Sequence, residues 1–235
     1  SYLEKGRKLF PDDSGLLFAE INYYLNEGKL DILTDKLKNA LVQEPDNISI
    51  YTTLGNVYDQ LNQELRSQGE ASDKVGLNHN AIEGPNDGCY IVNEDGSKEY
   101  LDNSACVGNP FAKANKYFNE SLKYYEQGLE KDPTNFDAVY SQGALYYNKA
   151  ASMTSSINEL ANDFSAAGTK KYDALKVEMD DYFGQALPYF KKAEEMNGND
   201  LNTLIALKEI YARQNDMTKV SEYKARIEAI QAGGN

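Results

Sequence analysis

Two cysteines and one histidine carry the most distinctive chemistry in this chain. Cys89 and Cys106 are the only cysteines and lie 17 residues apart, and His79 is the only histidine. A disulfide between the two cysteines would stabilise the fold by about 3 kcal/mol in the chain-entropy estimate. The alternative is two unpaired thiols in a reducing cytosol. A metal site made from the three residues lacks the paired, short ligand spacing of zinc sites, so we expect His79 to be a solvated loop residue.

Catalytic patterns are scarce in the rest of the sequence. There is no GxSxG elbow, no P-loop and no helix with paired histidines. The acidic pairs Asp180-Asp181 and Glu194-Glu195 are expected on solvated helix surfaces. The segment NEDGSKEYLDN has acids and a glycine, but not the alternating ligand spacing of an EF-hand. We therefore expect a protein that is not an enzyme and that has no cofactor and no metal.

The negative net charge of the chain disfavours some classes of binding partner. The chain has 24 basic and 37 acidic residues, so its net charge is 24 − 37 = −13, which opposes binding to nucleic acid and to anionic lipid. No apolar run approaches the roughly 20 residues that a transmembrane helix needs. The first residues do not form a signal peptide, so an exported form would have had its signal peptide removed.

The two cysteines flank a predicted β-hairpin. The stretch CYIVNEDGSKEYLD places Asp95-Gly96 between two strand-like runs, which is a strong signal for a two-residue turn. Pairing outward from that turn sets Val92 opposite Glu99, Tyr90 opposite Leu101, and Cys89 opposite Asp102. This register brings Cys89 near the segment that leads to Cys106. We therefore expect a Cys89–Cys106 disulfide in an exported protein of the periplasm or cell surface, and a cytoplasmic protein if the cysteines are free.

The elements around this hairpin are helical. Between residues 114 and 149, apolar residues recur every three or four positions on both sides of a break at Asp132-Pro133. The first stripe includes Tyr117, Leu122, Tyr125 and Leu129, and the second includes Val139, Gly143, Tyr146 and Tyr147. The small residue Gly143 is expected where two helices approach closely. The stretch therefore predicts two amphipathic helices joined by a tight turn.

This helix pair resembles a tetratricopeptide repeat (TPR), a helical hairpin of 34 residues with proline near its end. Pro11 and Pro45 are one such period apart, and the later repeats fit with insertions of 54 and 31 residues. The resemblance implies an all-α, right-handed TPR helical-hairpin superhelix (α-solenoid) with an inserted loop that contains a short β-hairpin. We expect a single array over 1–235. It would consist of the second helix of a truncated repeat at 1–13, and repeats at 14–47, 48–135 with an insertion of about 59–109, 136–200 with lengthened helices, and 201–235.

The lengthened repeat has its own pattern. Ala150, Met153, Ile157, Leu160 and Phe164 continue the helical spacing, so both helices of that repeat are expected simply to be longer. A turn is predicted at Ala167-Gly168-Thr169. Pro188 lies inside the returning helix, where we expect a kink because proline removes one intrahelical hydrogen bond.

By resemblance, the first helices of the repeats line a concave groove. Their groove-facing slots fall on Phe18, Asn22, Leu25, Asn26, Thr52, Asn56, Asp59, Gln60, Tyr140, Tyr147, Asn148, Glu209 and Arg213. Asn22 and Asn56 occupy the slot where asparagines of the family hold the backbone of an extended peptide, and an amide can both donate and accept there. They could equally make hydrogen bonds between repeats. Tyr140 and Tyr147 could equally be core residues between repeats.

These expectations favour a non-enzymatic protein-interaction scaffold that binds a peptide segment or a partner subunit in its groove. Self-association is compatible with the same architecture, and nucleic acid is not an expected partner. The alternative is a glycan or small-ligand binding protein that uses the insertions, similar to starch-binding outer-membrane lipoproteins with TPR frameworks. The absence of tryptophan, the usual platform for sugar stacking, counts against that alternative.

Overall fold

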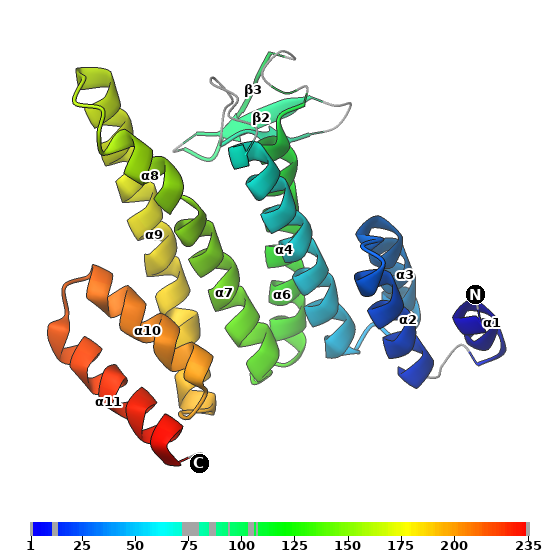
Figure 1. Cartoon of the computed structure of the whole chain (residues 1–235). Helices are drawn as coiled ribbons and strands as arrows, with labels where there is room; N and C mark the ends of the chain where they lie inside the picture. The colour runs from blue at the N-terminus through cyan, green and yellow to red at the C-terminus, as the bar shows by residue number, and fades with distance from the viewer. Residues whose placement is uncertain are drawn as a thin grey trace. The chain divides into compact units, whose positions relative to one another are not determined.

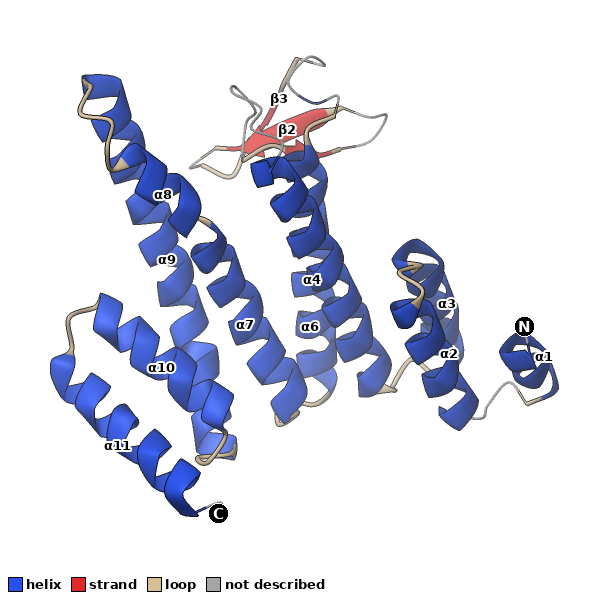
Figure 2. Ribbon diagram, in the orientation of Figure 1, coloured by secondary structure: helices blue, strands red, loops and turns tan. Residues whose placement is uncertain are grey.

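The structure is a computed structural model that describes residues 2–10, 14–71, 80–84, 88–93, 95–102, 106 and 108–233. Helices dominate it, and a small sheet is its only β-structure within those ranges (Figure 2). Its contacts divide the chain into two compact units, Ser1–Tyr117 and Phe118–Asn235. The expected His79 loop lies outside the described residues.

The first unit contains short helices followed by one long helix. They are α1 (Tyr2–Leu9), α2 (Ser14–Asn26), α3 (Leu30–Gln43) and α4 (Ile48–Ala71), followed by the start of α6 (Pro110–Lys131) (Figure 1). Gly28 has a φ of +66° in the turn between α2 and α3, a conformation that glycine adopts without steric cost. Glycine therefore suits this tight turn between the two helices.

A three-stranded sheet lies where α4 ends and α6 begins (Figure 1). Its antiparallel strands, in spatial order, are β1 (Ile82–Glu83), β2 (Cys89–Val92) and β3 (Lys98–Tyr100). The expected register is wrong by one residue, because Ile91 pairs with Glu99 and Tyr90 pairs with Tyr100. The Asn93 N–H donates to the Ser97 carbonyl at 2.9 Å, so three residues, and not two, lie between the last hydrogen-bonded residues of the hairpin.

The second unit is a set of antiparallel helix pairs. Its helices are α7 (Phe136–Ser152), α8 (Thr154–Leu160), α9 (Ala166–Met196), α10 (Leu201–Arg213) and α11 (Met217–Gly233), together with the end of α6. A core cluster that includes Phe183, Phe190, Leu207 and Ile210 joins these helices. Side chains cap the starts of α7 and α10, where Asn135 and Asp200 each accept a backbone N–H of the first turn.

The tip of the lengthened repeat differs from the prediction. The first helix is interrupted at Met153, and α9 begins at Ala166, before the turn expected at Ala167-Gly168-Thr169. Ser165 caps α9 by accepting the Gly168 N–H at 3.0 Å. A Cβ on Gly168 would lie 2.2 Å from Asp163 Cγ. The glycine therefore leaves room for the capping loop and does not break the helix.

The close approach predicted at Gly143 is confirmed. A Cβ built there would lie 3.1 Å from Tyr189 Cβ and 3.4 Å from the Phe190 ring, so α7 and α9 meet at the glycine. The helix α9 continues through the exposed Pro188, and the kink expected there stays a prediction.

The all-α class, the TPR-like helical hairpins and the short β-structure in the insertion are therefore confirmed. The assembly of all repeats into one array stays a prediction. Within the ranges described, no helix is both long and apolar enough to span a membrane.

Candidate functional site

The structure brings together three of the predicted groove residues in the second unit. Tyr147 lies on α7, and Glu209 and Arg213 lie one turn apart on α10. The Tyr147 hydroxyl donates to the Glu209 carboxylate. The Tyr147 ring packs edge-on against Phe183 and Phe190 of α9, with ring centroids 5.2 and 6.1 Å away. Tyr147, Glu209 and Arg213 are named here the α7–α10 surface.

Aromatic packing also holds Arg213. Its guanidinium carbon lies 4.2 Å from the centroid of the Phe183 ring, and Nη1 donates to Met179 Sδ at 3.8 Å. Phe183 is buried, whereas Arg213 is exposed. Among the described residues, no carboxylate forms an ion pair with Arg213. The stacked guanidinium therefore keeps donors for a ligand while its plane is fixed.

The electrostatics keep Tyr147 protonated. Burial, together with the hydrogen bond and the negative charge of Glu209, raises the pKa of Tyr147 to about 12, and the Arg213 cation acts in the opposite direction. At neutral pH the phenol is therefore a donor to Glu209. The surface thus presents an acceptor carboxylate and a cation side by side.

The remaining second-unit candidates take part in packing. Tyr140 is half-buried, stacks on Phe136 at a centroid distance of 6.1 Å and meets Phe190 edge-on. Burial and the nearby Asp200 raise the pKa of Tyr140. Asn148 is half-buried. Tyr140 and Tyr147 therefore both contribute to the core, and Tyr147 also has a polar contact at its edge.

The first-unit candidates fall into three groups. Asn22, Asn56 and Gln60 are exposed, and Gln60 donates to Glu64 at 3.1 Å. Thr52 is buried, and its hydroxyl donates to the Ile48 carbonyl at 3.2 Å, so it is poorly placed for a ligand. The side chain of Asn26 lies outside the described residues.

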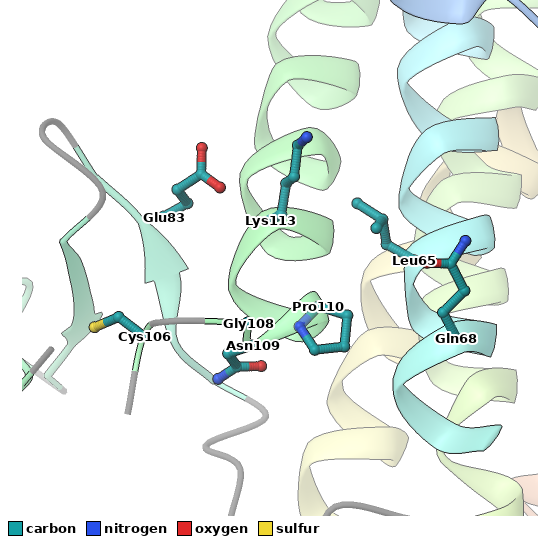
Figure 3. Close-up of a pocket in the computed structure, with 8 residues that line it drawn as sticks. All are labelled: Leu65, Gln68, Glu83, Cys106, Gly108, Asn109, Pro110 and Lys113. Carbon is teal, nitrogen blue, oxygen red and sulfur yellow. The ribbon is translucent and has the colours of Figure 1, made fainter. Parts of the chain in front are cut away.

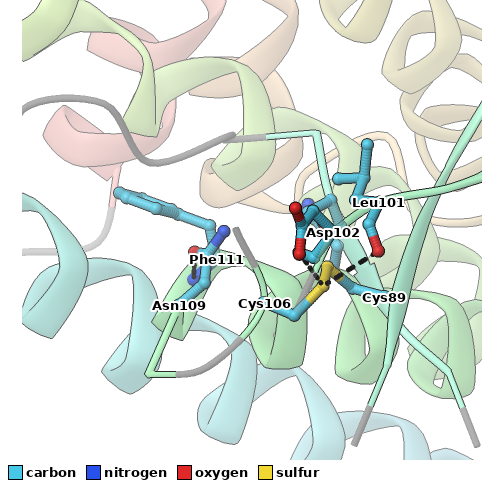
Figure 4. Close-up of a disulfide and its surroundings, with 8 residues drawn as sticks. Cys89, Leu101, Asp102, Cys106, Asn109 and Phe111 are labelled. Carbon is cyan, nitrogen blue, oxygen red and sulfur yellow. Dashed lines mark hydrogen bonds between the residues drawn. A yellow bond between two sulfur atoms is a disulfide. The ribbon is translucent and has the colours of Figure 1, made fainter. Parts of the chain in front are cut away.

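A disulfide joins Cys89 of β2 to Cys106, with the two Cα atoms 5.5 Å apart (Figure 4). Both cysteines belong to a small buried cluster with Ala81 and Ala112, against which Leu101 packs. Cys106 Sγ lies 3.4 Å from the Asp102 carbonyl oxygen. Because a disulfide sulfur carries no proton, this is a close contact and not a hydrogen bond.

Polar links also tie the insertion to the helices. The Asn115 amide donates to the Ala81 carbonyl at 2.8 Å, and its oxygen accepts a hydrogen bond from Arg66 of α4. Lys116 forms an ion pair with Glu83 of β1 at 2.6 Å. Arg66 and Asn115 are both buried. Two adjacent residues of α6, Asn115 and Lys116, therefore attach the sheet to this helix at β1.

A pocket with a volume of about 490 Å³ opens between α4, the start of α6 and the insertion (Figure 3). We name it the insertion pocket, and its lining consists of Leu65, Gln68, Glu83, Cys106, Gly108, Asn109, Pro110 and Lys113. The volume lies within the range typical of small-molecule sites. The sequence predicted an insertion here but gave no sign that Gln68, Glu83 and Lys113 converge.

No family model and no curated protein matches the chain. Solved structures with some likeness include monomeric mutants of IFIT1 with m7Gppp-AAAA and with Gppp-AAAA. Each is 15% identical, covers 97% of this chain and 50% of the IFIT1 chain, and has a TM-score of 0.41. A tetratricopeptide repeat protein from Parabacteroides merdae ATCC 43184 is 17% identical, covers 92% of this chain and 78% of its own, and has a TM-score of 0.20. This chain thus spans about half the length of the IFIT1 chain.

Proposed function

We propose that the protein is a non-enzymatic interaction scaffold that binds an extended peptide segment of a partner on the α7–α10 surface. The observation that carries this proposal is the packing of Tyr147 and Arg213 on buried rings of α9, with Glu209 accepting a hydrogen bond from Tyr147. A peptide backbone needs both donors and acceptors. Arg213 supplies donors and Glu209 supplies acceptor oxygens from a surface that loses little side-chain entropy on binding.

A peptide selection tests this proposal. A random peptide library is selected on the intact protein, and the affinity of each selected peptide is measured again on Arg213→Ala. We expect about tenfold weaker binding or more, because a hydrogen bond to a charged group contributes about 1.5 to 3 kcal/mol. The matched control is Lys224→Ala, which changes an exposed lysine of α11. Peptides that bind the Arg213 variant as tightly as the wild type would place their site elsewhere.

The exposed asparagines of the first unit support a second contact with the same kind of ligand. By resemblance to the family, Asn22 and Asn56 hold a peptide backbone. Replacing Asn56 by Ala should weaken a peptide that is selected for binding to the first unit by about 1 to 3 kcal/mol, with little effect on folding. Unchanged affinity together with a lower melting temperature would assign Asn56 to the packing of repeats.

We also infer that the protein works in an oxidising compartment outside the cytosol, in the periplasm or at the cell surface. The support is the Cys89–Cys106 disulfide, since a reducing cytosol does not maintain such bonds. Alkylation of protein taken directly from cells, followed by mass spectrometry without reductant, tests this inference. Two alkylated cysteines would overturn it.

The insertion pocket favours a second function, the binding of a small ligand. Its volume and its charged lining residues support this function. A glycan fits it poorly, because none of the eight lining residues is aromatic and sugars usually stack on aromatic rings. The groups that line the pocket favour a ligand that is not a glycan.

A further inference from the structure

We propose that the insertion pocket binds a carboxylate with a short apolar body, which pairs with Lys113 while its apolar part lies on Leu65 and Pro110. This proposal does not depend on the α7–α10 surface, which belongs to the other unit. The pocket residues come from α4, from the start of α6 and from the insertion (Figure 3).

Lys113 is the group that selects for negative charge. It is exposed, and its ammonium lies 5.5 Å from the centroid of the Tyr117 ring. This cation–π contact uses none of the three N–H donors of the ammonium. Among the described residues, no carboxylate forms an ion pair with Lys113. Within the described part of the chain, the pocket therefore offers a cation without an anionic partner, although the net charge of the chain is −13.

The acidic residue that lines the pocket already has a cationic partner. Glu83, the only acid among the lining residues, is paired with Lys116 at 2.6 Å. Gln68, one of two amide side chains in the lining, projects from α4 and has no hydrogen bond to another described residue. Lys113 and Gln68 thus place one cation and one amide, from two helices, at the same pocket, which suits the two oxygens of a carboxylate.

The start of α6 is not an additional anion site. Pro110 has no N–H, and the Phe111 N–H donates to Asn109 Oδ1 at 3.0 Å. The Ala112 N–H donates to the Asn109 carbonyl at 3.2 Å. The first donors of the helix are therefore already engaged. With one lysine and, among the described lining residues, no cradle of backbone N–H groups, the pocket fits a singly charged carboxylate better than a phosphate.

The apolar lining defines the rest of the ligand. Leu65, Pro110, Gly108 and the Cys106 part of the disulfide form a surface without further charge. The disulfide, the Asn115 link to Ala81 and the Lys116 pair with Glu83 hold the insertion wall in place. The pocket is therefore formed before a ligand binds, which lowers the entropic cost of binding.

Two sources can supply this chemistry, a free small organic acid or an acidic side chain of a partner peptide. The first arm of the test titrates isotope-labelled protein with sodium 3-phenylpropanoate and, separately, with the neutral 3-phenylpropanamide. We follow the backbone amide signal of Gly108 and the side-chain amide signal of Gln68 by NMR. The acid should shift both signals, and the neutral amide should bind at least about tenfold more weakly.

Variants separate recognition from folding. Lys113→Gln should weaken 3-phenylpropanoate by about tenfold or more, whereas Lys123→Gln, at an exposed position farther along α6, should leave its affinity unchanged.

The second arm uses a blocked Gly-Glu-Gly peptide. Tighter binding of this peptide than of the free acid identifies a partner side chain, and the reverse order identifies a free acid. The proposal is overturned if no acid shifts Gly108, if acid and amide bind equally, or if Lys113→Gln binds normally while its spectrum shows a folded protein.

Discussion

The helical core of the second unit and the insertion of the first are stabilised in different ways. In the second unit, buried apolar side chains from α7 to α11 form one continuous cluster. In the insertion, the buried cluster consists of Ala81, Cys89, Cys106 and Ala112. Such a small cluster buries little apolar surface. Packing over a large area therefore holds the helices, and a few discrete links hold the sheet.

The two regions should differ in how many structural elements a destabilising mutation affects. Each helix pair of a repeat structure is stabilised by the pairs beside it, so a cavity in the shared core affects several helices at once. A broken link in the insertion should affect only the insertion. Mutations in the two regions should therefore differ in the number of elements that they destabilise, as well as in the loss of free energy of unfolding.

The largest expected effect is that of Phe190→Ala. Phe190 is 1% exposed and contacts Tyr140, Tyr147 and the site of Gly143. Its truncation should lower the free energy of unfolding by about 3 to 5 kcal/mol, measured by chemical denaturation followed by circular dichroism. Phe164→Ala is the control, since Phe164 is 90% exposed and its loss should change stability by less than about 0.5 kcal/mol. Equal losses in the two variants would contradict the core described here.

The next effect is that of removing the disulfide by replacing Cys89 and Cys106 with Ser. The loss should be about 3 kcal/mol and should be confined to the insertion. Limited proteolysis should cut between Gly69 and Asn109 while the second unit stays intact. Cleavage that is equally fast throughout the chain would show that the insertion supports the helices as well.

A smaller loss is expected for Asn115→Ala. The substitution removes the donor to the Ala81 carbonyl and one acceptor of Arg66, which should cost about 1 to 3 kcal/mol. Hydrogen exchange at Ile82 and Glu83 should become faster. Asn119→Ala, at an exposed position one turn farther along α6, should leave that exchange unchanged. If both variants behave alike, Asn115 does not anchor β1.

The smallest effect is an alkaline loss of stability in the second unit. Tyr146 and Tyr147 have pKa values raised from 10.0 to about 12, chiefly by burial. A raised pKa means that the folded state holds the proton more tightly, so this contribution is complete below pH 10 and is lost as pH rises through about 12. Melting temperature measured against pH should show the decline, with a shallower slope in Tyr147→Phe. Tyrosinate absorbance that rises fully near pH 10 for all tyrosines would contradict it.

The helical part of the fold could be predicted because its signal is local. Apolar residues every three or four positions predicted α6 and α7, and the contact at Gly143 followed from its small size. The turn predicted at Ala167-Gly168-Thr169 is wrong, because these residues already belong to α9. Gly168 instead leaves room for the Asp163 side chain beside the first turn of α9.

The sites were less predictable because they depend on contacts between distant residues. The hairpin at Asp95-Gly96 was expected, but its register depends on which residues make the last hydrogen bond before the turn, and that pair is Asn93 and Ser97. Family slots led to Tyr147, Glu209 and Arg213, yet Phe183 beneath Arg213 comes from another helix. Lys113 and Gln68 are 45 positions apart in the sequence, and no periodic pattern relates them.

The link from Asn115 to Ala81 also determines how the insertion can be shortened or transferred to another repeat protein. Asn115 bonds to the insertion and to Arg66, and Arg66 donates in turn to Asn62 at 3.1 Å. Deleting the insertion would remove the carbonyl that Asn115 binds and would disturb this buried polar chain inside the host helices. A minimal version of the repeat therefore needs apolar replacements at Arg66 and Asn115, and a graft of the insertion needs both residues to be carried with it.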